Sequence, residues 1–290
     1  MLAINSCFLF ITFPGHIFIL AMNILEWKKN KRLDISDQLI SGLGLLSFLY
    51  KVFQVGFKCV EVIHGVQAFT GSAWLSVYLI YNSLNFCTLL FSTWLTIHFC
   101  LKIVNINQNF YIYIQRMFPK MFPWILLPSV LVSLLISLPA AQDLSKHYSN
   151  STFLLNLGSS QLKRFHYLKL YYSITSFCFV FSLIPLLITI VSLCRHIHRM
   201  QSHSLRLRAD SVSAHVYAVK TLILLLCLNC LQFVIPVLVT QRRYNSTFIP
   251  VIFLFLVMWH LCNLPILIRG SSKLQKKLHE IWICCSFLVS

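Results

Sequence analysis

The chain has 290 residues, of which 58% are apolar and only 11% are charged, and its formal net charge is +17. A soluble domain of this length needs more charged surface than this composition supplies, so the composition indicates a membrane protein. The basic residues are spread along the chain and are not gathered on one soluble face, which argues against a nucleic-acid-binding protein.

Seven apolar stretches are long enough to cross a bilayer, because one helical crossing needs about 20 apolar residues. In chain order they are residues 7–27, 38–57, 74–101, 121–138, 170–193, 217–240 and 248–268. They are too long for the strands of a membrane barrel, and inside lipid every backbone polar group must be paired, so we expect helices. The sequence therefore predicts an all-α fold, a single seven-transmembrane-helix bundle over residues 1–290. Its tail, residues 269–290, can form a short amphipathic helix.

The basic residues between the spans predict the orientation of the bundle. Most of the 24 Lys and Arg residues lie in the first, third and fifth gaps and in the tail, while Lys51 lies inside the second span. Short basic loops stay in the cytosol, so we expect the amino terminus outside and the tail inside a plasma membrane. Two N-glycosylation triplets, beginning at Asn150 and Asn245, fall in gaps assigned to the outside.

The sequence offers little support for an enzyme or a metal site. It has seven acidic residues, no carboxylate pair at membrane depth for acid–base catalysis, and no His-Glu-x-x-His or similar metal spacing. We therefore predict neither enzymatic activity nor a cofactor. Cys284 and Cys285 follow the basic tail, and palmitoylation and ordinary thiols both remain open for them.

Seven helices with an outside amino terminus suggest a G-protein-coupled receptor, although the marks of the large rhodopsin-like class are absent. The third span ends in F-C-L-K at residues 99–102 and has no Asp-Arg-Tyr. The sixth span lacks Cys-Trp-x-Pro, and the seventh lacks Asn-Pro-x-x-Tyr.

The junction of the fifth and sixth spans carries the most specific pattern. Residues 192–203 read S-L-C-R-H-I-H-R-M-Q-S-H, and the segment continues through Arg208 and Ser211 to A-H-V-Y-A-V-K-T at residues 214–221. This junction resembles the type 2 taste receptor family, the bitter receptors, whose pattern is S-L-W-R-H-x-x-x-M-Q-x-H, then R-D-P-S, then A-H-V-x-A-x-K-T. The register is kept without a gap across the whole junction.

Other segments resemble the same family. Residues 101–105, L-K-I-V-N, are similar to L-K-I-A-N, and residues 15–27 and 269–274 are similar to the family's first helix and to the end of its seventh. The chain is thus identified as a divergent member. It has Leu46 and Ser47 where the family has Ser-Arg, and Asn263 and Leu264 where the family has His-Ser. Whether these changes leave signalling intact is open from the sequence.

The resemblance implies a receptor whose bitter-tasting small-molecule agonist binds in the extracellular half of the helix bundle. Placing the family patterns on this chain gives the candidate ligand residues Tyr81, Asn85, Asn229, Gln232, Phe253 and His260. Tyr81 and Asn85 are four residues apart, so they lie on the same helix face. The alternative is that the amide side chains only bond neighbouring helices.

The resemblance also implies coupling to a gustducin-like heterotrimeric G protein at the cytoplasmic ends of helices three, five and six. The basic residues expected there are Lys102, Arg195, His196, Arg208, His215 and Lys220. Their alternative role is to keep these loops in the cytosol. A vomeronasal type 1-like receptor and a membrane transporter are the rival interpretations. Agonist, tissue and oligomeric state are left open.

Overall fold

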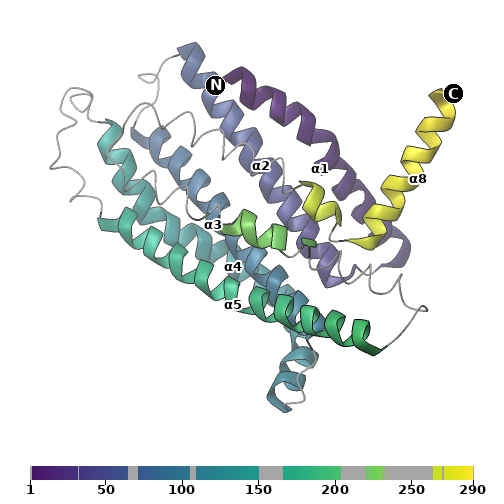
Figure 1. The fold of residues 1–290 in the computed structure, drawn as a ribbon. Coiled ribbons are helices and arrows are strands. Elements are labelled where there is room, and N and C mark those ends of the chain that lie inside the picture. Colours follow the sequence, from purple (N-terminus) through teal and green to yellow (C-terminus); the bar gives the residue numbers. More distant parts are fainter. Residues whose placement is uncertain are drawn as a thin grey trace.

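The computed structural model describes residues 2–31, 33–64, 71–104, 109–149, 166–203, 220–221, 223–230, 233, 264–269 and 271–289. Every regular element within these ranges is an α-helix (Figure 1). The long helices are α1 (Leu2–Asn30), α2 (Ile35–His64), α3 (Gly71–Ile103), α4 (Asn109–Ser149), α5 (His166–His203) and α8 (Ser272–Val289). The predicted all-α fold is confirmed.

Five of these helices are long and apolar enough to cross a membrane. The candidate crossings are Phe10–Asn30, Ile35–His64, Ser72–Ile103, Tyr111–Gln142 and Leu170–Arg195. They coincide with the first five spans expected from the sequence. The sixth and seventh spans are described only in part, as helical residues at 220–221, 223–230 and 233 and at 264–269.

The helices run beyond the spans marked by hydropathy, and α4 differs most. It has 41 residues, against the 18 of the predicted span 121–138, and it takes in Arg116 and Lys120 at one end. Hydropathy locates only the part of a helix that lies in lipid. A helix of this length is about 60 Å long, roughly twice the hydrocarbon thickness, so both of its ends reach past the apolar layer.

The helix α3 is the centre of the bundle. In its most apolar segment 67% of the residues are buried inside the protein, against 22–44% in the other four crossings. Hydroxyl groups on this helix donate to carbonyls one turn earlier, as Ser83 does to Leu79 at 2.6 Å and Thr93 does to Leu89 at 2.8 Å. These bonds satisfy the polar side chains inside the apolar bundle.

The main hydrophobic core joins α1, α2, α3, α4, α8 and the described part of the seventh span near one end of the bundle. Its buried side chains include Ile19, Leu39, Ile40, Leu43, Phe91, Leu95, Phe118, Phe122, Leu267 and Leu274. Glycines permit close packing around it. A Cβ atom at position 42 would lie 2.5 Å from Cε1 of Phe91, and one at position 15 would overlap Cδ2 of Leu264. Small residues let membrane helices approach closely in this way.

The described helix ends define the two ends of the bundle. The helices α1, α3 and α5 end, and α2, α4 and α8 begin, at the end that we call the basic end, toward the lower right in Figure 1. It carries the basic side chains Lys28, Lys29, Lys31, Lys102, Arg116, Lys120, Arg195 and Lys273. From this end α8 extends away from the other helices (Figure 1).

Candidate functional site

Four tyrosines from three helices meet in the half of the bundle away from the basic end; we call them the tyrosine cluster (Tyr50, Tyr81, Tyr171 and Tyr172). The Tyr50 hydroxyl donates a hydrogen bond of 2.5 Å to the Tyr81 hydroxyl, and the two ring centroids are 5.0 Å apart. The rings of Tyr171 and Tyr172 meet edge to face at 5.4 Å. The cluster therefore connects α2 with α3 by polar and aromatic contact, and α5 contributes the other two rings.

Asn85 connects α3 with α5 in the same region. Its side chain hydrogen-bonds Tyr171, whose hydroxyl donates to the backbone carbonyl of Asn82 at 3.1 Å. The ring of Tyr171 also packs against Phe86, with centroids 6.1 Å apart. Tyr81 and Asn85, which the sequence places on one face of a helix, thus contact two different neighbours: Tyr81 contacts α2 and Asn85 contacts α5.

An aromatic wall continues from Tyr81 toward the start of α3. Trp74 is buried, stacks on Tyr78 at a centroid distance of 5.5 Å, and meets Phe57 of α2 edge to face, also at 5.5 Å. Aromatic faces beside hydroxyl and amide groups can hold an amphiphilic molecule, because the rings supply apolar area and the polar groups fix its orientation.

Asn229, another candidate ligand residue, lies in a different part of the bundle. Ser92 of α3 donates a hydrogen bond of 3.0 Å to Oδ1 of Asn229, and both side chains are buried. Ser92 lies eleven residues beyond Tyr81, so this contact is about 16 Å closer to the basic end. Gln232, Phe253 and His260 lie outside the described residues. Of the three candidates that the structure describes, Tyr81 and Asn85 lie at the tyrosine cluster and Asn229 does not.

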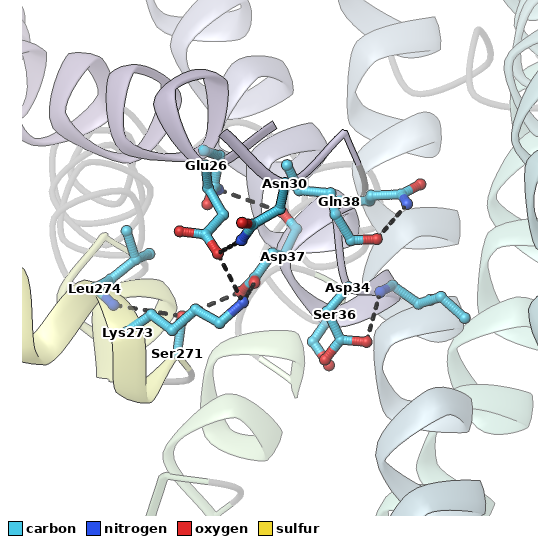
Figure 2. A network of polar contacts seen from close by, with 12 residues as sticks. Glu26, Asn30, Asp34, Ser36, Asp37, Gln38, Ser271, Lys273 and Leu274 are labelled. Carbon is cyan, nitrogen blue, oxygen red and sulfur yellow. Dashed lines mark hydrogen bonds and ion pairs between the residues drawn. The ribbon is translucent and has the colours of Figure 1, made fainter. Parts of the chain in front are cut away.

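The basic end also contains a polar network, shown in Figure 2, that the sequence did not predict. Asp37, which is only 5% exposed, accepts hydrogen bonds from Ser271 Oγ at 3.1 Å and from Lys273 Nζ at 3.2 Å. Lys273 also lies 3.5 Å from a carboxylate oxygen of Glu26. Asn23 donates to the backbone carbonyl of Asp37 at 3.4 Å. The network joins α1, α2 and the start of α8.

Ser271 shows how the sequence begins α8 at this place. Its backbone carbonyl accepts from the amide of Gln275 at 3.1 Å, and its hydroxyl lies 3.5 Å from the amide of Leu274. Serine is a preferred residue just before a helix, because its hydroxyl satisfies an otherwise unpaired amide. The same hydroxyl donates to Asp37. The cap of α8 is therefore also its attachment to α2.

The charge of Lys273 fits this attachment. Partial burial lowers its pKa, but the hydrogen bond and charge of Asp37 and the charge of Glu26 outweigh burial and raise the pKa of Lys273 above its ordinary value. The ammonium therefore stays protonated at neutral pH. Because the Lys273 side chain is 55% exposed, water screens much of this attraction.

Further contacts at the basic end hold α3 against its neighbours. Lys102 Nζ lies 3.4 Å from Asp34, just before α2, and Ser36 Oγ lies 2.9 Å from His98 Nε2. The Tyr111 hydroxyl, on α4, lies 2.8 Å from the carbonyl of Cys100 and 3.0 Å from that of Val104. The Cys100 carbonyl lies in the last turn of α3 and also accepts from the amide of Val104 at 2.9 Å, and Val104 directly follows the helix, so Tyr111 ties α4 to the end of α3.

The structure describes four of the six candidate coupling residues. Lys102 and Arg195 are exposed, in the last turn of α3 and toward the end of α5, and Lys220 is exposed at the described start of the sixth span. His196 lies within α5. Arg208, His215 and the glycosylation triplets at Asn150 and Asn245 lie outside the described residues.

A groove at the basic end is separate from the tyrosine cluster. It has a volume of about 640 Å³ and lies between α1, α2 and α4, where its lining includes Asn23, Trp27, Lys31, Gln38 and Pro119. Its place beside the α1–α2 turn puts it at the opposite end of the bundle from Trp74 and Tyr81. It does not belong to the candidate ligand site.

Comparison with known proteins places the chain in a family. The family model described as taste receptor protein (TAS2R) matches residues 1–286. The taste receptor type 2 member 41 of Mus musculus is 32% identical over 237 residues, 79% of this chain and 76% of the relative. That of Pan paniscus is 31% identical over 225 residues, 74% of this chain and 72% of the relative. The taste receptor type 2 member 7 of Macaca mulatta is 26% identical over 289 residues, 94% of this chain and 90% of the relative. The chain therefore belongs to the type 2 taste receptor family, the bitter receptors of seven-helix, G-protein-coupled architecture, and is a multi-pass membrane receptor and not an enzyme.

Proposed function

We propose that the chain binds a bitter small molecule at the tyrosine cluster, with Tyr81 and Asn85 as its first polar contacts. The observation that carries this proposal is that these two residues, one turn apart on α3, bond different helices, Tyr81 to α2 and Asn85 to α5. A ligand that forms a hydrogen bond with Tyr81 or Asn85 in place of the neighbouring helix weakens the contact between α3 and that helix. Asn229, Gln232, Phe253 and His260 complete the proposed ligand residues.

The proposed orientation places the basic end in the cytosol and the tyrosine cluster toward the outside of the plasma membrane. Basic residues concentrate at the inner face of membrane proteins, and Lys28, Lys29 and Lys102 lie at this end together. The amino terminus is then extracellular and the tail, including α8, is cytoplasmic. Asn150 and Asn245 are the proposed glycosylation sites.

The basic end is the proposed surface for a gustducin-like G protein. Its proposed contact residues are Lys102, Arg195, His196, Arg208, His215 and Lys220, at the ends of helices three, five and six. A ligand shifts the receptor toward an active packing only by binding that packing more tightly than the resting one. In our proposal, a ligand that bonds the Tyr81 hydroxyl in place of Tyr50 moves α3 against α2, and the weak, exposed Lys102–Asp34 pair offers little resistance.

The polar network at the basic end is the proposed substitute for the arginine that the family carries in its second helix. Here Ser47 stands at that position and is 2% exposed. Leu264, at a second departure from the family pattern, packs against Gly15 of α1. With the arginine absent, Asp37, Ser271 and Lys273 supply the described polar connection between α2 and the start of α8.

Calcium release in cells expressing the full chain with a promiscuous G-protein α subunit, across a panel of bitter compounds, tests this proposal. We expect at least one agonist, and a loss of potency in Tyr81→Phe, which removes only the hydroxyl that bonds Tyr50. The matched control is Tyr113→Phe on α4, because Tyr113 is 61% exposed and lies near the basic end. Equal potency of wild type and Tyr81→Phe for every agonist, at equal surface expression, would contradict the proposed site.

A further inference from the structure

A lysine is buried inside the bundle on the helix that carries Tyr50. Lys51 lies within the apolar crossing Ile35–His64 and is only 3% exposed. Its neighbours Leu49 and Val52 are 43% and 42% exposed and form the outer, lipid-facing side of α2, whereas Ser47, one turn earlier, is 2% exposed. The side chain of Lys51 therefore faces the bundle interior and not the lipid.

The ammonium group of Lys51 has no fixed counter-charge in the described part of the chain. Its partner there is a neutral amide, Oε1 of Gln54 at 3.3 Å. The sequence has few other carboxylates that could serve as a counter-charge. Five of its seven acidic residues belong to the basic end, to the loop between the fifth and sixth spans, or to the tail, and the other two are Glu61 and Asp143. Glu61 is ten residues further along the same helix, which corresponds to a rise of about 15 Å.

A buried ammonium with only an amide partner is costly, and ionisable residues retained inside membrane helices mark binding or transport sites. Lys51 follows directly after Tyr50, whose hydroxyl bonds Tyr81. The aromatic wall of Phe57 and Trp74 lies further along the same two helices, in the direction away from the basic end. One cation thus stands beside a cluster of aromatic rings and neutral hydroxyls.

We propose that Lys51 anchors the anionic group, a carboxylate or sulfonate, of an amphiphilic aromatic ligand whose ring packs on the tyrosine cluster. This inference rests on the proposed function and narrows its ligand class to organic anions. The ammonium supplies charge-assisted hydrogen bonds to the anion, which are stronger than neutral ones, and Gln54 orients the ammonium. The anion provides the missing counter-charge.

Ligand-dependent protection of the purified full chain in detergent micelles tests the site without needing signalling. The readout is thermal unfolding followed with a thiol-reactive dye that reports exposure of the buried Cys87 and Cys100. The probes are naphthalene-2-sulfonate and its neutral isostere naphthalene-2-sulfonamide. We expect the sulfonate to protect the wild type at a concentration at least about tenfold lower than the sulfonamide, because bonds to a charged group are worth that much.

Substitutions separate the charge from the fold. Lys51→Met keeps the length and removes the charge, and it should abolish the preference for the sulfonate; Lys51→Arg should keep most of it. Val52→Met is the control, because Val52 lies on the lipid-facing side of the same helix, so the change leaves the ammonium and its amide partner in place and should retain the preference. Equal protection by both probes in the wild type, protection by neither, or a sulfonate preference that survives in Lys51→Met would overturn the inference.

The same variants in the calcium assay distinguish this inference from the proposed function. Neutral agonists that activate wild type and Lys51→Met equally, with no sulfonate preference in the protection assay, support the receptor function and overturn the Lys51 site. Sulfonate protection that depends on Lys51, with no G-protein activation by any compound of the panel, supports the anion site and contradicts the proposed function.

Discussion

Replacing Gly42 by alanine adds one methyl group where α2 lies against α3. The new Cβ would lie 2.5 Å from Cε1 and 2.8 Å from Cδ1 of Phe91, so the buried ring or the helix must shift. Overpacking of this kind costs about 1–3 kcal/mol of stability. Alanine in place of glycine within a helix returns about 1 kcal/mol, which obscures the cost when the variant is compared with wild type alone.

Gly56 provides the matched control. It lies on the same helix, and a Cβ there meets nothing within 4 Å, so Gly56→Ala receives the helix-propensity gain without the clash. We therefore expect Gly42→Ala to be less stable than Gly56→Ala by about 1–3 kcal/mol. The measurement is thermal unfolding of both purified full-length variants in the same micelles, followed by exposure of Cys87 and Cys100.

A second substitution tests whether Phe91 causes the loss. Phe91→Leu removes the ring atoms that the new methyl group meets, so the cost of Gly42→Ala should be smaller in the Phe91→Leu background than in wild type. Contacting residues are expected to show such non-additivity. Equal stability of Gly42→Ala and Gly56→Ala, or a loss that is the same in both Phe91 backgrounds, would refute the described packing of α2 on α3.

Further predictions concern two other contacts and the orientation of the chain. Ser92→Ala removes the buried bond to Asn229 and should lower the stability by about 0.6–1.7 kcal/mol, the range for hydrogen bonds between membrane helices; no loss in thermal unfolding would contradict that bond. Lys273→Ala should cost less than about 1 kcal/mol because Lys273 is half exposed. The folded pKa of Lys273 is raised, so its contribution is complete below pH 10.5 and is lost as the pH rises through the folded pKa. Unfolding temperatures of wild type and Lys273→Ala should therefore differ by a constant amount from pH 6 to 9; a difference that falls within that range would contradict the Asp37–Lys273 contact. Asn150→Gln should remove a glycosidase-sensitive shift in electrophoretic mobility, and the absence of such a shift in wild type would count against the orientation.

The sequence predicted the membrane-crossing helices well because the bilayer requires each crossing to be apolar along its whole length. A run of about 20 apolar residues is a one-dimensional signal, and the five crossings that the structure describes agree with the first five expected spans. Helix ends carry no such signal. α4 reaches Ser149, although hydropathy stops at residue 138, and it continues past Pro139, a residue that from sequence alone marks a helix end.

The contacts between helices were much harder to predict. The Asp37–Ser271 bond joins residues 234 positions apart, and nothing local in either segment indicates the other. Its available signals were a serine before the tail helix and one acidic residue near the start of α2, and neither identifies its partner. The family pattern identified Tyr81 and Asn85. Tyr50 and Tyr171 could not be identified from the sequence, because hydropathy does not determine how α2 and α5 are rotated about their axes and hence which of their side chains face α3.

The central helix α3 makes polar contacts in two separate parts of the bundle. It bonds α2 and α5 through Tyr81 and Asn85 in the half away from the basic end, and it contacts the start of α2 through Lys102 at the basic end. A rigid helix transmits a displacement along its length, so α3 is the element through which the proposed ligand site acts on the proposed coupling surface. The buried network around Asp37 holds α1, α2 and α8 together beside it.

Agonist-dependent nucleotide exchange on a G-protein α subunit, in membranes that contain the full chain, is the decisive test of the proposed receptor function. We expect exchange to rise with agonist concentration in wild type, and we expect Tyr81→Phe to shift the response to higher concentration at equal receptor density. Solute flux across the same membranes without any agonist-dependent exchange would contradict it and would favour a transporter.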